Sequence, residues 1–83
     1  MAIMGWRHAC VELLANRVGP VADLLVDDVL AEIGVKEHDV TANHFMKIVR
    51  AVYEKLPATL DRRGICQELQ VAVLQAYGFS NKH

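Results

Sequence analysis

Residues 19–34 read GPVADLLVDDVLAEIG and contain one amphipathic helix with its start and stop signals. Pro20 favours a helix start, because the first helical position needs no N–H donor. Gly34 suits the left-handed position that follows a helix C-terminus. At about 100° per residue, the apolar side chains between these signals fill an arc of roughly 180°, which predicts a central helix with a wide buried face. That face consists of Val21, Ala22, Leu25, Val26, Val29, Leu30 and Ile33.

Similar signals divide the rest of the chain. Gly19-Pro20, Gly34, Pro57 and Gly78 separate four segments with helical periodicity, and no segment alternates as a half-buried strand does. We therefore predict an all-α, compact four-helix domain with helices at about 6–17, 20–33, 40–56 and 61–77. Their expected apolar faces include Trp6, Cys10, Leu13 and Leu14 in the first helix, Phe45, Ile48, Val49, Val52 and Leu56 in the third, and Ile65, Cys66, Leu69, Ala72, Val73, Ala76 and Tyr77 in the fourth.

Polar side chains predict how the later helices begin and end. Asp39 or Thr41 can cap the third helix, and Thr59 or Asp61 can cap the fourth, because their side-chain oxygens can accept from free N–H groups of the first turn. Gly78 is expected to end the fourth helix, with Phe79 meeting Leu74 in a C-terminal cap.

Composition favours one domain, residues 1–83, with an aliphatic core. Apolar residues make up 53% of the chain and aromatic residues only 6%. A domain of 83 residues cannot hide all of its apolar side chains, so this excess favours contact with a partner, most simply another copy of the chain as a homo-oligomer, with a dimer favoured.

The charge pattern bears on the class of partner. A net charge of -1 argues against a generic nucleic-acid or anionic-membrane binder, so we expect neither nucleic acid nor membrane as partner. Residues 1–40 hold three basic and seven acidic side chains, whereas residues 41–83 hold six basic and three acidic ones. These opposite halves can pair within the fold, which is the simpler interpretation, or attract a neighbouring copy.

The two cysteines indicate a reduced, cytoplasmic protein. Cys10 and Cys66 each fall on an apolar helix face, where a free thiol behaves as a small hydrophobic group. We expect no signal peptide, because charged residues interrupt the first apolar run. No stretch reaches the roughly 20 apolar residues needed to span a bilayer.

A search for chemistry predicts no catalytic, cofactor-binding or metal-binding residues and hence no enzyme. His8 and Cys10 are two residues apart, so on a helix they point in different directions and cannot share a metal. His38 and His44 belong to no ligand motif. Cys66 lies on the expected core face, where a thiol is inert. Gly19-Pro20 lacks the repeated glycines and the lysine of a phosphate loop.

The residues left over after the core is assigned are the candidates for partner binding. They are Leu24, Asp27, Ala31, Met46, Tyr53 and Val71. They predict a non-catalytic protein–protein interaction or scaffolding module that self-associates. The alternative is a small DNA-binding regulator of the helix-turn-helix kind, because basic residues gather around the third helix and the turn after it. Those residues are Lys47, Arg50, Lys55, Arg62 and Arg63.

The segment LANRVGPVADLLV, residues 14–26, resembles a family of small helical domains. That family has an I/V-G-P-I/V-A-x-x-L/V-V core and occurs near the C-terminus of some bacterial signalling proteins, including serine/threonine kinases. The resemblance extends loosely through residues 45–70. It implies an accessory or scaffolding role in bacterial signalling, and it supplies no catalytic residues to carry over.

Overall fold

The structure is a computed structural model that describes residues 3–75, and its regular elements are all helical. Helix α1 spans Trp6–Val18, α2 spans Ala22–Ile33, α3 spans Ala42–Lys55 and α4 spans Arg62–Gln70. Short 3-10 turns, η1 at Gly19–Val21 and η2 at Glu37–Asp39, precede α2 and α3, and a π-helical turn, η3 at Val71–Gln75, extends α4. The prediction of an all-α domain is confirmed for the described residues, which contain no strand.

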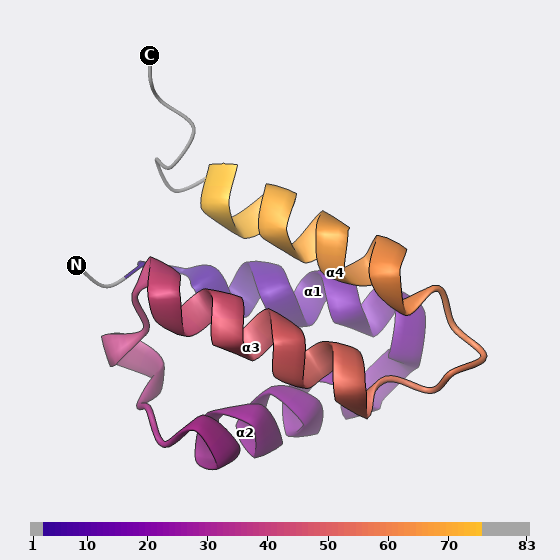
Figure 1. The fold of residues 1–83 in the computed structure, drawn as a ribbon, viewed down its shortest axis with the longest axis horizontal. Helices are drawn as coiled ribbons and strands as arrows, with labels where there is room; N and C mark the ends of the chain where they lie inside the picture. Colours follow the sequence, from indigo (N-terminus) through magenta and orange to yellow (C-terminus); the bar gives the residue numbers. More distant parts are fainter. Residues whose placement is uncertain (1–2, 76–83) are drawn as a thin grey trace.

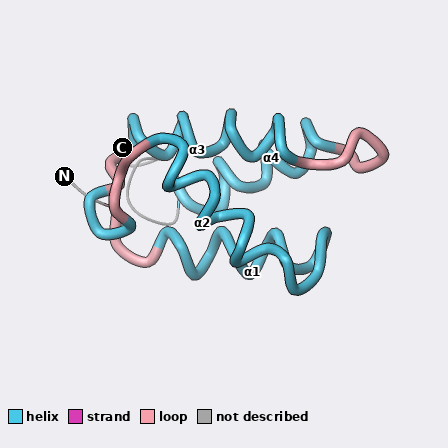
Figure 2. The backbone as a smooth tube through the Cα atoms, turned by 90° about the horizontal axis from the view of Figure 1, so that it is seen from below, coloured by secondary structure: helices cyan, strands magenta, loops and turns pink. Residues whose placement is uncertain are grey.

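The helices lie side by side with short connections between them. Helix α3 lies between α2 and α4, and both helices contact it (Figure 1). Helix α1 contacts α2 on one side and α4 with η3 on the other. Seen from below, the loops gather at the two ends of the helices (Figure 2). The α3–α4 loop and the α1–α2 turn therefore come near each other at the same end of the molecule.

The ends of α2 and α3 follow from local hydrogen bonding. Gly34 has a φ of 83°, and its N–H donates to the carbonyl of Leu30 at 2.8 Å, as expected for a glycine after a helix C-terminus. Thr41 caps α3: its Oγ1 accepts from the His44 N–H at 3.3 Å, while the Thr41 N–H donates to His44 Nδ1 at 3.1 Å. Of the two caps predicted for this helix, Thr41 is right and Asp39 is wrong.

Helix α4 begins with a similar cap. The carboxylate of Asp61 accepts from the Gly64 N–H at 3.1 Å, so Asp61 caps the helix and Thr59 does not. The α-helical geometry ends at Gln70 rather than continuing to 77, because the backbone widens into the π-helical turn. Leu74 is packed against the core at this turn. Its predicted contact with Phe79, and the stop at Gly78, lie outside the described residues.

The core lies where the apolar faces of the helices meet. Trp6 and Phe45 anchor it, with ring centroids 6.1 Å apart and an interplanar angle of 64°. The Trp6 Nε1–H donates to the Glu37 carbonyl at 2.8 Å, which joins the start of α1 to η2. Most predicted core positions are confirmed as buried: Cys10, Leu14, Ala22, Val26, Val29, Leu30, Ile48, Val49, Val52, Leu56, Ile65, Cys66, Leu69 and Val73.

The prediction also differs from the structure around the start of the second and third helices. The second α-helix begins at Ala22 rather than at 20, because Gly19–Val21 forms η1. Val21 was expected on the buried face of the second helix, but it is 52% exposed. It belongs to η1, whose tighter winding turns its side chain away from the direction an α-helix would give it. The third helix begins at Ala42 rather than at 40, because Val40 is extended and Thr41 is the cap. Val40 is nevertheless buried, and its carbonyl accepts from the Ile3 N–H at 2.7 Å.

Candidate functional site: an apolar cleft and a neighbouring groove

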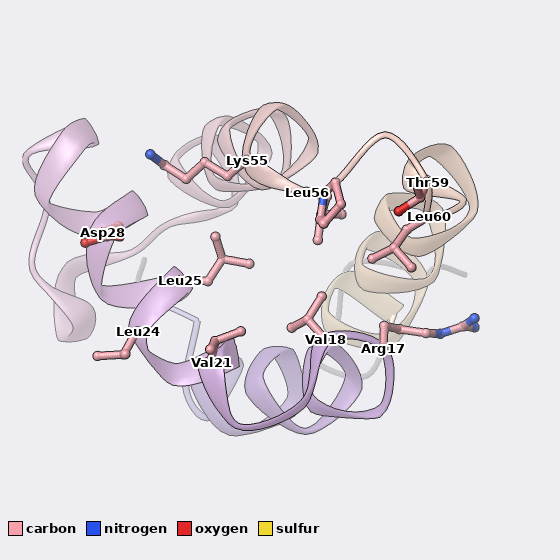
Figure 3. Close-up of a pocket in the computed structure, with 11 residues that line it drawn as sticks. Arg17, Val18, Val21, Leu24, Leu25, Asp28, Lys55, Leu56, Thr59 and Leu60 are labelled. Carbon is pink, nitrogen blue, oxygen red and sulfur yellow. The ribbon is translucent and has the colours of Figure 1, made fainter.

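An open cleft of about 500 Å³ lies where the end of α1 and the start of α2 face the end of α3 (Figure 3). Its lining is mostly apolar. Val18, Val21 and Leu25 approach from one side, and Leu56 and Leu60 approach from the other. Leu24 points outward at its edge rather than toward Leu56 (Figure 3). The remaining lining residues are Arg17, Asp28, Lys55, Pro57 and Thr59.

Two chain reversals create this cleft. On one side Gly19, with a φ of 79°, redirects the chain through η1 into α2, which leaves Val21 at the surface. On the other side Pro57 follows α3, and Leu56 before it is extended, with φ -72° and ψ 144°. The loop after Pro57 then holds Leu60 partly buried against the core. The cleft is thus a direct result of the Gly-Pro and Pro signals in the sequence.

The charged groups at the rim of the cleft differ in whether they have partners. Arg17 pairs with Glu68 of α4 at 2.8 Å, and Lys55 pairs with Glu32 of α2 at 3.4 Å. Within residues 3–75, Asp28 makes no ion pair. The acidic group at the edge of the cleft is therefore available to an external cation.

A second hollow, of about 610 Å³, lies along the surface where α3 and α4 meet, and we name it the α3–α4 groove. Met46, Val49 and Tyr53 line it from α3, at spacings of three and seven residues that place them along one face of the helix. Arg62 of α4 lies over the Tyr53 ring, with its guanidinium carbon 4.7 Å from the ring centroid. The full lining is Met46, Lys47, Val49, Arg50, Tyr53, Glu54, Cys66 and Gln70.

The six predicted partner residues do not form one surface. Leu24 and Ala31 are exposed on α2, and the Leu24 side chain is 64% exposed. Met46, 45% exposed, and Tyr53 line the α3–α4 groove. Val71 is 50% exposed and lines a shallower hollow between α1 and α4. The structure therefore brings together the two α2 residues, and separately the two α3 residues, but leaves Val71 apart from both.

Asp27, the sixth predicted partner residue, is engaged within the chain. Arg7 of α1 reaches Asp23 at 2.6 Å, Asp27 at 2.8 Å and Glu37 at 3.2 Å. The hydrogen bond to Asp23 raises the pKa of the Arg7 guanidinium above its ordinary value, and Asp27 adds to the rise while partial burial opposes it. One cation therefore faces three carboxylates, and this part of the surface stays acidic.

Comparison with known proteins gives a family but no activity. The family profile of a domain of unknown function (DUF8082) matches residues 5–77, a range that includes every helix described above. The chain belongs to this family. No curated protein and no solved structure was found to match the chain. The DUF8082 match agrees with the resemblance to a small domain of unassigned biochemistry, and its description names neither a ligand nor a partner.

The two thiols of this DUF8082 domain are buried. Burial raises the pKa of the Cys10 thiol to about 12 and also raises the pKa of the Cys66 thiol. The Cys66 Sγ–H donates to the Val49 carbonyl at 3.6 Å, so the thiol serves as a donor between α4 and α3. Both thiols are protonated near neutral pH, which makes them poor nucleophiles.

In residues 3–75 no group of three or more His, Cys, Asp or Glu side chains is arranged to hold a metal ion. Over the same range, no helix has both the length and the apolar character needed to cross a bilayer.

The basic residues that suggested DNA binding fall into two groups, those that contact a partner side chain and those that do not. Lys55 is held by Glu32, and Arg62 lies over Tyr53. In the part of the chain that the structure describes, Lys47, Arg50 and Arg63 have no carboxylate within ion-pair distance. Two of these three, Lys47 and Arg50, line the α3–α4 groove.

Sequence reasoning missed Val21 as a surface residue. Its position next to Gly19-Pro20 was the available signal, because a glycine and a proline before a helix often produce a 3-10 turn rather than a full α-helical turn. Leu24 and Asp28 are four residues apart on one face of α2, and Val21 lines the same cleft from the turn before the helix.

Proposed function

We propose that this DUF8082 domain is a non-catalytic protein-interaction module that self-associates, with a dimer as the first step of assembly. The observation that supports the proposal is the exposed apolar edge of the cleft, where Val21 and Leu24 are 52% and 64% exposed. Full burial of a Val or Leu side chain stabilises a contact by about 1.5–3 kcal/mol, so covering what these two expose offers roughly 2–3 kcal/mol. In the signalling setting that the motif resemblance implies, such a module acts as a scaffold.

Leu24→Glu tests this function. The substitution places a charge at the centre of the proposed contact, and loss of the Leu24 burial alone weakens association by about tenfold or more. Light scattering at increasing protein concentration should show the unmodified protein above the monomer mass and the variant close to it.

Met4→Glu is the matched control. Met4 is 79% exposed and lies at the opposite end of α1 from the cleft, so the same loss of an apolar side chain should leave self-association unchanged. Monomer mass for the unmodified protein at every concentration would remove the self-association claim. Equal loss in both variants would show that Leu24 has no special role.

The DNA-binding alternative has one supporting observation, the free cations Lys47, Arg50 and Arg63 in the described structure. It requires affinity for mixed-sequence DNA that falls steeply as salt rises, because each phosphate contact releases counterions. A salt titration of DNA binding, followed by fluorescence anisotropy, separates the two functions. Absence of binding at low salt contradicts the alternative.

A further inference from the structure

The exposed surface of α2 carries a line of side chains suited to lie in a groove. Leu24, Asp28 and Ala31 are separated by four and three residues, so they share one face of the helix, and all three are exposed. This face combines one large apolar side chain with a carboxylate that has no cation partner within residues 3–75. It is an amphipathic helix surface without an internal partner.

The α3–α4 groove has the complementary chemistry. Its α3 wall presents Met46 and Tyr53 as apolar contacts, and Lys47 and Arg50 as cations. Neither cation has a carboxylate partner anywhere in the described structure, although Glu54 lies four residues beyond Arg50 on the same helix. The groove can therefore accept an apolar side chain that is flanked by carboxylates.

Within residues 3–75, internal ion pairing leaves most of the charge difference between the two halves uncompensated. Among the ion pairs formed by described residues, only Glu32 with Lys55 joins an acid of residues 1–40 to a cation of residues 41–83. Within residues 3–75, three of the four carboxylates of α2 share two cations, Arg7 and Lys55, and the fourth, Asp28, has none; Arg7 is also shared with Glu37. Within the described part of the chain two ion pairs join the halves, Arg17 with Glu68 and Lys55 with Glu32, and only the second pairs an acid of the acidic half with a cation of the basic half.

The fold prevents α2 from reaching the groove of its own chain. Helices α2 and α4 lie on opposite sides of α3 (Figure 1), so α3 stands between α2 and the α3–α4 groove of the same chain. A second copy brings the two surfaces together. Because α3 stands between the two surfaces of each copy, one contact joins α2 of one copy to the groove of the other, which makes it head-to-tail: each copy offers α2 to one neighbour and the groove to another.

We infer that α2 of one copy lies in the α3–α4 groove of the next, with Leu24 against Met46 and Tyr53 and with Asp28 beside Arg50. The inference rests on the proposed self-association and specifies its geometry. Helix-in-groove contacts of this kind use apolar anchors for affinity and charges for register. The assembly grows beyond the dimer as concentration rises, because each added copy leaves one α2 and one groove free.

Two charge-reversed variants test the geometry, Asp28→Lys and Arg50→Glu. Asp28→Lys reverses a charge on the α2 surface and leaves the groove unchanged, and Arg50→Glu does the opposite. Each variant alone should therefore associate at least about tenfold more weakly than the unmodified protein. When they are mixed, the intact groove of Asp28→Lys meets the intact α2 of Arg50→Glu. The two reversed surfaces also carry opposite charges, so the mixture should regain assembly above the monomer mass by light scattering, with the two variants alternating.

Glu12→Lys and Lys36→Glu are the matched control pair. They make the same charge changes at exposed positions outside both surfaces, so they should assemble as the unmodified protein does. Circular dichroism of all four variants should show unchanged helix content, because every substituted side chain is at the surface.

The outcomes separate this inference from the function on which it rests. If the unmodified protein stays monomeric, self-association fails and the head-to-tail contact fails with it. If the unmodified protein assembles and Leu24→Glu does not, but Asp28→Lys and Arg50→Glu assemble normally, the function stands and this geometry is wrong. If both reversals abolish assembly and their mixture stays monomeric, the copies meet through like surfaces and the head-to-tail contact is overturned.

Discussion

Replacing Trp6 should remove much of the stability of the domain. Trp6 is 1% exposed, packs edge-on against Phe45 and donates to the Glu37 carbonyl at 2.8 Å. Truncation of a buried Trp to Ala costs about 3–5 kcal/mol. A domain of this size has about 4–12 kcal/mol of unfolding free energy in total, so Trp6→Ala is expected to be marginally folded. Trp6→Phe keeps most of the ring packing and loses the hydrogen bond, for a cost of about 1–2 kcal/mol.

The assay is urea denaturation followed by far-ultraviolet circular dichroism, because Trp6 is the only tryptophan and its fluorescence disappears in both variants. The midpoint should fall in the order unmodified protein, Trp6→Phe, Trp6→Ala, with the slope of the transition unchanged between the first two. A loss of unfolding free energy below about 1 kcal/mol for Trp6→Ala would refute the reasoning, because truncation of a buried tryptophan to alanine normally costs about 3–5 kcal/mol.

Three further perturbations test local features of the fold. Gly34→Ala forces a side chain into a φ of 83° with open space around it, so urea denaturation should show a loss of about 1 kcal/mol from backbone strain alone. Thr41→Ala removes the cap of α3 and should cost about 1 kcal/mol in the same assay. Because the folded pKa of Cys10 is raised, its thiol favours the fold below pH 9.0 and disfavours it as pH rises toward about 12. Relative to Cys10→Ala, the unmodified protein should therefore lose about 1.4 kcal/mol of unfolding free energy between about pH 8 and pH 10.

Local chemistry made most helix boundaries predictable. Gly34 and Asp61 act as the sequence indicates, because their roles depend on backbone hydrogen bonds within a few residues. The third-helix core face was equally predictable, since α3 is a regular helix and its apolar residues recur at helical spacing. The prediction fails where the backbone leaves α-helical geometry. Val21 in the 3-10 turn is exposed and Leu74 in the π-helical turn packs against the core, and a uniform α-helix predicts neither.

The candidate site was less predictable, because it depends on which elements meet. Leu24 was identified from its position among carboxylates, which is a property of one helix. The cleft beside it needs the loop after Pro57 to fold back toward α2, and helical periodicity contains no information on that approach. The sequence also does not show which charged side chains pair, because pairing depends on the fold. In the structure Asp27 pairs with Arg7, whereas Asp28 has no ion pair within residues 3–75.

The head-to-tail contact can be observed directly with isotope-filtered nuclear Overhauser spectroscopy on a mixture of labelled and unlabelled copies. Only protons on different copies give signals in this measurement. The account predicts cross-peaks from the Leu24 methyl groups of one copy to the Tyr53 ring and the Met46 methyl group of another. Cross-peaks between the Leu24 methyl groups of two copies, without any to Tyr53 or Met46, would contradict it.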